Sequence, residues 1–386
     1  MGFNMVNYYD MPTPLVLVDL DRLEHNITKT AEMAEKNGKI LWPMFKTSKS
    51  SFIAKLQVKA GADGFLCGTI DEAEVLVNHN LTKNIMIAYP VVDKVNLNRL
   101  IKLAEKDVRI ILRIDNLDLA EHINEHLKKH ELHFEYCVKV DVGDHRFGVK
   151  PERVGKFVKK LEKYSNLKFI GLATHQGNAY EASNPKEVEE IAKKTANLME
   201  IAVKSLRKYG FEPEIIGAGA TPTLRFDVES PVYTHLFPGN YIYYDRTQAL
   251  VYGSASLDNC ALTVLVTIIS IPEHANGSIA MINAGSRFFD KRIHGHIRGY
   301  GQLVEYPKAI LISISQEVSK LDITQERNIH VGEKVRVITN HSCFTNDGAC
   351  FIIGHRGEHV EEIIPIDAKS EIRLEKVILN NLLLSS

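Results

Sequence analysis

The sequence lacks long apolar stretches and an excess of either charge. No apolar run reaches about 18 residues, so we expect no membrane-spanning helix. The 47 basic and 48 acidic side chains give a formal net charge of −1, which favours neither a nucleic-acid partner nor a membrane surface. Residues 1–14 lack the basic and apolar regions of a signal peptide, so we do not expect export.

Cysteine is also scarce. The chain has five cysteines, an odd number, scattered between Cys67 and Cys350. Such a set does not predict the disulfide framework of a small exported protein. Thiols persist in a reducing compartment, so we expect a cytoplasmic protein.

An ordinary globular composition remains, with 386 residues, 45% hydrophobic and 25% charged. This length is too great for one small core and predicts a large domain with a smaller one. Through the first 245 residues, short apolar runs alternate with amphipathic stretches. Two of the expected helices are residues 50–62, stopped near Gly61, and residues 184–210, stopped at Gly210.

Eight such runs, most followed by a helix, predict an α/β fold of the (β/α)8 TIM barrel type. An open, doubly wound sheet is the alternative, but eight near-regular units close more naturally than they stay open. The eight runs are residues 39–45, 64–68, 84–89, 108–114, 133–141, 167–174, 213–219 and 240–245.

The pattern changes after about residue 250, where short strands follow one another with little helix between them. This predicts a C-terminal all-β domain. Residues 11–19 read as a further strand that returns to that domain. We therefore divide the chain into an N-terminal segment 1–12 packed on the β-domain, a barrel domain 13–247 and a β-domain 248–386.

Lys46 ends the first predicted strand, in the stretch ILWPMFKTSKS. Because strand residues alternate between faces, Lys46 shares one side with the apolar Trp42 and Met44. The carboxyl ends of barrel strands carry active sites, and an apolar surrounding lowers a lysine pKa and frees a nucleophilic amine. A lysine that extends its ammonium into solvent from a strand end is the alternative.

Two stretches rich in small residues follow the seventh predicted strand and open the eighth. Gly217, Gly219 and Thr221 form the first, and Gly239-Asn240-Tyr241 the second. Small residues let backbone N–H groups approach an anion, and barrels often bind phosphate after strands seven and eight. Plain turns would explain either stretch equally well.

Polar residues also follow the fifth and sixth predicted strands. Arg146 lies just past the fifth and His175 just past the sixth, at the same end of the sheet. Farther on, His341 and Cys343 stand two apart after a strand. On an extended chain both would face one side, and imidazole with thiolate suits a zinc ion. Each alone also fits a surface charge, a structural histidine or chance.

Taken in order, these motifs resemble the fold type III pyridoxal-phosphate enzymes, most closely the D-serine dehydratase and D-threonine aldolase group, relatives of alanine racemase. The resemblance covers nearly the whole chain. It runs through PTPLVLVDLDRLEHNI, FKTSK, GADGFLCGTIDEAEVL, VDVGDHRFGV, GLATHQGNAY, VYTHLFPGNYIYYD and GEKVRVITNHSCFT.

The resemblance implies a role for each site residue. Lys46 would hold pyridoxal 5'-phosphate as a Schiff base and act as the catalytic base. His175 would lie against the pyridine ring, with Arg146 near the cofactor's phenolate or ring. His341 and Cys343 would bind a divalent metal, zinc by the donor types. The phosphate would be held by Gly217, Gly219, Thr221, Gly239, Asn240 and Tyr241.

The resemblance also implies a homodimer, with the β-domain of one subunit facing the barrel mouth of the other. The implied activity is a metal-assisted lyase acting on a D-3-hydroxy amino acid, either as a dehydratase releasing a 2-oxo acid and ammonia or as an aldolase. An amino-acid racemase is the first alternative, with a second base among the tyrosines of residues 1–11 and 296–306. A non-catalytic pyridoxal-phosphate carrier is the other.

This chain departs from the family pattern at three places. Relatives usually read Arg-Pro-His-x-Lys-Thr-His-Lys where this chain has residues 42–49, WPMFKTSK. Relatives often carry Glu-Glu-His-Gly where this chain has residues 316–319, and Arg287 takes the place of a common lysine. These departures affect positions that would surround the cofactor and the substrate.

Overall fold

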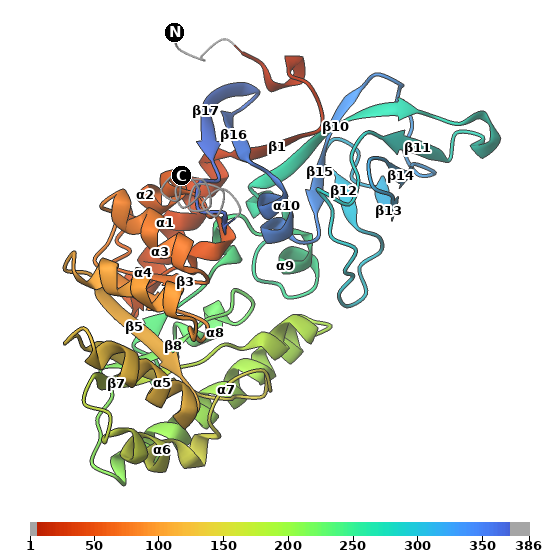
Figure 1. Ribbon diagram of the computed structural model, residues 1–386. Helices are drawn as coiled ribbons and strands as arrows, with labels where there is room; N and C mark the ends of the chain where they lie inside the picture. The colour runs from red at the N-terminus through yellow and green to blue at the C-terminus, as the bar shows by residue number, and fades with distance from the viewer. Residues whose placement is uncertain (1–5, 371–386) are drawn as a thin grey trace, which may run out of the picture. The chain divides into compact units, whose positions relative to one another are not determined.

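The computed structural model describes residues 6–370, which form two compact units (Figure 1). Among these residues, the β unit comprises the chain up to Lys29, Glu181–Pro185 and Asn240–Ile366. The α/β unit comprises Thr30–Tyr180, Lys186–Gly239 and the chain from Asp367. Parts of the predicted segments 1–12 and 248–386 lie outside the described residues.

The α/β unit is built on one sheet of eight parallel strands in the order β2-β9-β8-β7-β6-β5-β4-β3. An isolated parallel bridge between Met44 and Leu66 joins the chain after β2 to β3. The strands are β2 (Ile40–Leu41), β3 (Phe65–Cys67), β4 (Asn84–Ile87), β5 (Arg109–Ile114), β6 (Phe134–Lys139), β7 (Leu167–Ala173), β8 (Ile215–Ala218) and β9 (His235–Leu236). The first seven lie within the predicted runs.

The eighth strand was predicted in the wrong place. It is β9, and residues 240–242 instead form the short 3-10 helix η5 (Asn240–Ile242). Tyr241, Ile242 and Tyr243 are all buried, so this apolar run has no exposed alternate face. The Asn240 amide donates to the Asp245 carboxylate across 2.6 Å, which bends the chain back on itself. An apolar run alone does not distinguish a buried helical turn from a buried strand.

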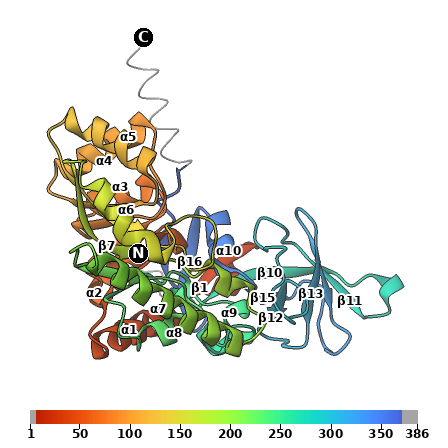
Figure 2. The same ribbon diagram turned by 90° about the horizontal axis from the view of Figure 1, so that it is seen from below.

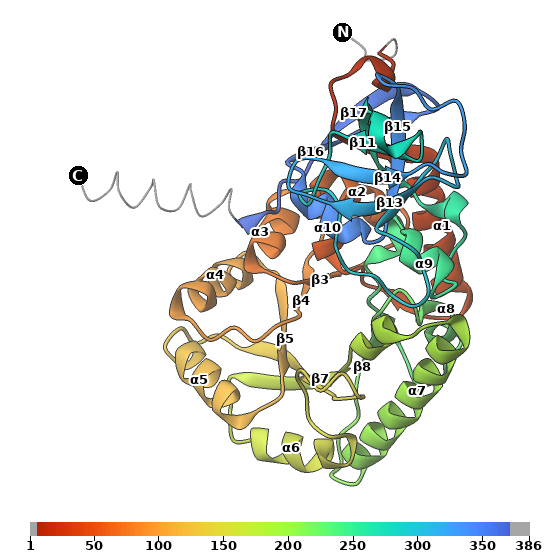
Figure 3. The same cartoon turned by 90° about the vertical axis from the view of Figure 1, so that its right-hand side faces the viewer.

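Helices follow most of the parallel strands, and Figure 3 shows α3 to α7 around the outside of the strands. Both helices predicted in detail, α2 and α7, are present, and each is followed by a glycine with positive φ, Gly61 and Gly210. The helices are α1 (Leu20–Lys36), α2 (Ser51–Lys59), α3 (Ile70–Asn78), α4 (Lys94–Ala104), α5 (Leu117–Lys128), α6 (Val154–Leu161), α7 (Pro185–Arg207), α8 (Leu224–Asp227), α9 (Arg246–Leu250) and α10 (Ser342–Gly348).

The two faces of the parallel sheet carry separate apolar clusters. The larger one packs the sheet against its helices. The inner cluster draws a side chain from every strand or its extension, among them Trp42 and Met44, as the alternation predicted. Its other buried members are Leu66, Met86, Ile111, Cys137, Ile170, Ala173, Ile215 and Phe237.

The β unit is built mainly of antiparallel strands, and the β-rich chain predicted after residue 250 is present. Strand β11 pairs with both β14 and β10, so the six strands β11-β14-β13-β12-β15-β10 close on themselves. Figure 2 shows β10, β15, β12 and β13 in this unit. Strand β1, expected to return to this domain, pairs antiparallel with β10 and parallel with β16.

The strands of this unit are β1 (Leu15–Asp19), β10 (Leu262–Ser270), β11 (Ile279–Ile282), β12 (Gly301–Leu303), β13 (Ile310–Ile314), β14 (Ser319–Asp322), β15 (Lys334–Thr339), β16 (Phe351–Arg356) and β17 (His359–Pro365). Strands β12 and β14 are too short and too polar to have been predicted. No helix within residues 6–370 is both long and apolar enough to cross a membrane.

Candidate active site

Lys46 lies in the α/β unit, in the 3-10 turn η2 (Phe45–Thr47). The predicted placement on an apolar strand face was wrong, because β2 ends at Leu41 and the strand-like path ends with the Met44 bridge. The Ser48 N–H donates to the Phe45 carbonyl at 3.2 Å, which closes a helical turn and lifts Lys46 into an exposed position. Its ammonium donates to the Tyr89 hydroxyl at 3.3 Å.

Tyr89 is the meeting point of two predicted site residues. It lies just past β4, and its ring centroid is 6.0 Å from Lys46 Nζ and 6.0 Å from the Arg146 guanidinium carbon. Arg146 also lies over the Phe147 ring and pairs with Asp144 at 3.4 Å. Lys46 and Arg146 therefore converge from two different strand ends. The sequence reading missed Tyr89, although a tyrosine just past a barrel strand is a detectable signal.

His175 follows β7 and carries an uncharged imidazole. Its Nδ1 contacts the Gly219 carbonyl oxygen. Because a carbonyl oxygen can only accept a hydrogen bond, Nδ1 must carry the proton, and Nε2 of the neutral ring is then an acceptor. Burial lowers the pKa of His175 to about 3, and the nearby charges of Lys139, Lys46 and Arg146 act in the same direction. A neutral flat ring in this position suits contact with another aromatic ring.

Two buried basic side chains lie on the inner side of the sheet. Arg113 on β5 and Lys139 on β6 are each 6% exposed. Burial lowers the pKa of Arg113 to about 10, and burial followed by the charge of Arg113 holds the pKa of Lys139 well below its usual range. Both were read as parts of apolar runs. Arg113, Lys46 and Arg146 give the site a positive potential, which favours an anionic ligand.

The glycines predicted to grip a phosphate are required by packing. A Cβ on Gly217 would lie 2.1 Å from the Phe237 ring, and one on Gly219 would lie 2.5 Å from the Phe237 carbonyl oxygen. A Cβ on Gly239 would lie 2.5 Å from Thr47 Oγ1. The chain therefore lies close to its neighbours at all three positions, where only glycine fits without a shift.

Thr221 supplies a donor at the same loop. It is 2% exposed, and within residues 6–370 its Oγ1 has no hydrogen-bond partner. A buried hydroxyl without a partner is costly, so this loop fits a phosphate, whose oxygens would accept from the hydroxyl. The donor set of the α/β unit therefore suits pyridoxal phosphate.

Asn240 and Tyr241 belong to the β unit rather than to this loop. The Asn240 amide donates to Asp245, and its Oδ1 accepts from Ser342 Oγ at 3.0 Å. Tyr241 is fully buried. The structure therefore groups Gly217, Gly219, Thr221 and Gly239 in one unit and gives the Asn240 side chain other partners.

The predicted metal pair lies in the β unit, but not on an extended chain. His341 is the N-cap residue of α10, and Cys343 lies in its first turn. The two side chains are nevertheless hydrogen-bonded to each other, because the start of the helix turns Cys343 back towards the cap. The extended-strand argument was therefore wrong, although it named two neighbouring side chains.

His341 is oriented by partners that the sequence reading missed. The Asp290 carboxylate lies 2.9 Å from His341 Nδ1 and Arg292 Nη2 lies 2.7 Å from it. Burial opposes the charged ring, but the hydrogen bonds to Asp290 and Cys343 outweigh it and raise the pKa of His341 to about 10. A carboxylate on Nδ1 leaves Nε2 as the metal-binding nitrogen, a common arrangement for metal-ligating histidines.

Within the described chain, no group of three or more His, Cys, Asp or Glu side chains could hold a metal ion. His341 and Cys343 therefore offer two donors rather than a closed cage. The donor types fit zinc, and binding would have to displace the proton that His341 carries.

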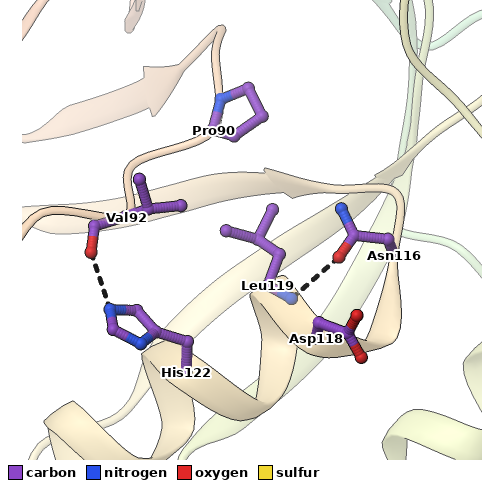
Figure 4. Close-up of a pocket in the computed structure, with 6 residues that line it drawn as sticks. All are labelled: Pro90, Val92, Asn116, Asp118, Leu119 and His122. Carbon is purple, nitrogen blue, oxygen red and sulfur yellow. Dashed lines mark hydrogen bonds between the residues drawn. The ribbon is translucent and has the colours of Figure 1, made fainter.

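A surface pocket of about 370 Å³ lies elsewhere in the α/β unit (Figure 4). It is lined by Pro90, Val92, Asn116, Asp118, Leu119 and His122. His122 Nε2 lies 2.6 Å from the Val92 carbonyl oxygen, and the Asn116 side chain caps α5 through the Leu119 N–H at 2.8 Å. These bonds fix the loop before α4 to the start of α5. None of the predicted site residues lines this pocket.

The fold and the site define a pyridoxal-phosphate enzyme of fold type III. Residues 18–247 match the family "Alanine racemase, N-terminal domain", and residues 261–353 match the family "Putative serine dehydratase domain". Because the first match covers more than half of the chain, the protein belongs to the family defined by the alanine racemase N-terminal domain. The resemblance read from the sequence is confirmed.

Several relatives are similar over most of their length. A D-threo-3-hydroxyaspartate dehydratase of Delftia sp. is 26% identical over 354 residues, 87% of this chain and 92% of that protein. A D-serine dehydratase of Dictyostelium discoideum is 27% identical over 384 residues, 89% of this chain and 93% of that protein. A crystal structure of D-threonine aldolase from Filomicrobium marinum has a TM-score of 0.84 and 26% identity, covering 96% and 99% of the two chains. The predicted class, lyases of D-3-hydroxy amino acids, is confirmed.

Proposed function

We propose that this protein is a pyridoxal-phosphate-dependent dehydratase that removes the β-hydroxyl of a D-3-hydroxy amino acid as water and releases a 2-oxo acid and ammonia. The observation that carries the proposal is the convergence of Lys46 and Arg146 on the Tyr89 ring. Lysine and arginine from separate strand ends thereby share one site with the neutral His175. The dehydratases among the relatives support the reaction type.

The residues of the α/β unit would hold the cofactor. Lys46 would be its covalent attachment point, His175 would lie against the ring, and Arg146 would lie near the phenolate. The phosphate would be held by Gly217, Gly219, Thr221 and Gly239, and by backbone groups of Asn240 and Tyr241. When bound, pyridoxal phosphate supplies the electron sink for the electrons left on the α-carbon.

The chain's own groups would move the protons. Lys46 Nζ would take the proton from the substrate α-carbon and later give one to the departing hydroxyl. The Tyr89 hydroxyl, 3.3 Å from Lys46 Nζ, would orient that nitrogen through their hydrogen bond. His341 and Cys343 would hold a divalent metal, zinc by their chemistry, which supplies a Lewis acid for the β-hydroxyl.

The alternatives are an aldolase and a racemase. An aldolase would use the same cofactor site but break the Cα–Cβ bond. One similar structure is named a D-threonine aldolase. A racemase needs a second base, for which tyrosines of residues 1–11 and 296–306 were candidates. Among these, the Tyr9 hydroxyl donates to Glu305 at 3.1 Å and the Tyr306 hydroxyl to Glu333 at 2.6 Å.

The finer architecture is part of the proposal. The parallel sheet would close as a (β/α)8 barrel, which the Met44–Leu66 bridge supports. Two subunits would form a homodimer with shared active sites in the cytoplasm. Residues 13–247 would seat the cofactor, residues 248–386 would bring the metal pair, and residues 1–12 would pack on the β-domain.

The test is a substrate panel with the cofactor-loaded protein: D-serine, D-threo-3-hydroxyaspartate and D-threonine, with their L enantiomers as controls. We expect 2-oxo acid and ammonia from at least one of the D substrates that can lose water. A chelator should abolish turnover while the visible absorbance of the cofactor persists. Full activity in metal-free protein would contradict the metal's role, and solvent deuterium at the α-carbon of both enantiomers without 2-oxo acid would favour a racemase.

A further inference from the structure

Glu72 is a carboxyl side chain enclosed beside Lys46. It lies in the first turn of α3, where its N–H donates to the Thr69 cap at 3.2 Å, and it is 1% exposed. Its Oε2 accepts from the Gly68 N–H at 2.7 Å. Over the described part of the chain, the other oxygen, Oε1, has no hydrogen-bond partner. An enclosed carboxyl with one unpaired oxygen is costly to keep, so the groups that this oxygen faces matter.

Gly68 brings Glu72 and Lys46 together. A Cβ built on Gly68 would lie 3.4 Å from Glu72 Oε1 and 3.5 Å from Lys46 Cβ. The unpaired carboxyl oxygen and the lysine side chain therefore flank the same point. Met44 Cε lies 3.4 Å from the same point, and the turn from β3 into α3 holds the carboxyl there.

The charges around Glu72 single out the lysine loop. Burial raises the pKa of Glu72 to about 7, against the Gly68 N–H and the charges of Lys49 and Lys46, which lower it. On β3, burial and then the charge of Glu72 raise the pKa of Cys67. On the other packed elements, Arg99 of α4 is bonded to Asp71 and Glu74, both at 2.8 Å, and Asp71 also accepts from Ser370.

We propose that Glu72 is a positioning residue whose carboxylate stabilises positive charge on the Lys46 nitrogen, an inference that rests on Lys46 being the cofactor lysine. When Nζ takes a proton from the substrate it becomes cationic, and Glu72 supplies the counter-charge in a low-dielectric position. When Nζ passes that proton to the leaving hydroxyl, the charge disappears again. Glu72 touches neither substrate nor cofactor and acts through Lys46.

The first test is a pH titration of the cofactor's visible absorbance band in loaded wild type and in Glu72→Gln. Removing the carboxylate should lower the midpoint of that band by about one pH unit, a tenfold change in the protonation equilibrium at the Lys46 nitrogen. Glu74→Gln is the matched control, because Glu74 is on the same helix and pairs with Arg99 instead. A Glu72→Gln midpoint equal to wild type, or an equal shift in Glu74→Gln, would overturn the proposal.

A second measurement works even if Glu72→Gln fails to fold. Glutamate labelled with ¹³C at the side-chain carboxyl would report the Glu72 titration by NMR in wild type and in Lys46→Met, both without cofactor. We expect one glutamate that titrates near pH 7, with a midpoint that rises when Lys46 is replaced. An unchanged midpoint would refute the coupling. If the cofactor does not attach to Lys46 in the wild-type protein, the proposed function itself is refuted.

Discussion

At the scale of single residues, the site depends on the charge and hydrogen-bonding groups that a few side chains present. Lys46, Arg146 and the neutral His175 surround a region where the chain supplies positive charge and a hydroxyl without a partner. The buried Arg113 guanidinium adds to that positive potential. An anionic, aromatic ligand such as pyridoxal phosphate would satisfy each of these groups.

Thr221→Val tests the phosphate loop, because valine keeps the shape of threonine and removes the hydroxyl. A hydrogen bond to a charged group contributes about 1.5–3 kcal/mol, so we expect the dissociation constant of the cofactor to rise about tenfold or more. Equilibrium binding of the cofactor to apoprotein measures it. Thr195→Val on α7 is the control, since its buried Oγ1 also has no partner among the residues described. Equal effects of the two changes would contradict the assignment.

The imidazole of His175 makes folding sensitive to acid. Its pKa is about 3 in the folded state, against 6.5 for an unperturbed ring. Between those values the unfolded chain binds the extra proton, so stability falls as the pH drops below about 6.5. Urea unfolding of apoprotein at pH 7 and pH 5 should show a larger loss for wild type than for His175→Gln, by up to about 2 kcal/mol. Equal losses would show that His175 is protonated in the folded state.

At the scale of elements, the loop that carries Lys46 is held by a distant part of the chain. Helix α2 begins directly after this loop, and its N-cap residue Ser50 makes no side-chain capping bond. Asp367 supplies the cap instead, accepting from Ser51 N–H at 3.0 Å and from Ser51 Oγ at 2.6 Å. Ala368 adds a backbone bond to the Lys49 carbonyl.

Asp367→Ala should lower the free energy of unfolding by about 1 kcal/mol, the usual value of an N-cap side chain. Asp367→Asn keeps an acceptor oxygen and should recover most of the loss. Thermal or urea unfolding of both variants measures the difference. A wild-type stability for Asp367→Ala would mean that Ser51 finds another partner.

The same scale explains which elements could be predicted. The seven parallel strands, α2, α7 and β1 follow from apolar periodicity and glycine stops, which are local signals. The eighth strand could not be predicted, because Tyr241 to Tyr243 are buried by a helical turn whose Asn240–Asp245 bond has no periodic signature. Residues joined only by tertiary contact, such as Asp367 and Ser51, are invisible to any local pattern.

The candidate site divides in the same way. Lys46, Arg146, His175 and the glycines could be named because they follow strands in a recognisable order. Tyr89, Glu72, Asp290 and Arg292 were missed, since each matters only through a contact formed in the folded chain. His341 and Cys343 were named by a strand argument, yet they meet at the start of α10.

At the scale of the whole molecule, the proposed chemistry is divided between two units, with Lys46 in the α/β unit and His341 and Cys343 in the β unit. A shared site in a homodimer makes a sharp prediction. Lys46→Ala and His341→Ala, each inactive alone, should complement each other when their subunits are exchanged. Half of the dimers would be mixed and each would have one intact site, so about a quarter of wild-type activity should return. No recovery in mixed dimers would place both residues in one subunit's site.

The most direct measurement locates the cofactor's covalent bond. Borohydride reduction of the loaded protein makes that bond permanent, and mass spectrometry of the digested protein then identifies the modified lysine. The account predicts a pyridoxyl group on Lys46, in fragments that separate it from Lys49. A group on Lys49 or Lys139 with Lys46 unmodified, or no modified lysine at all, would contradict it.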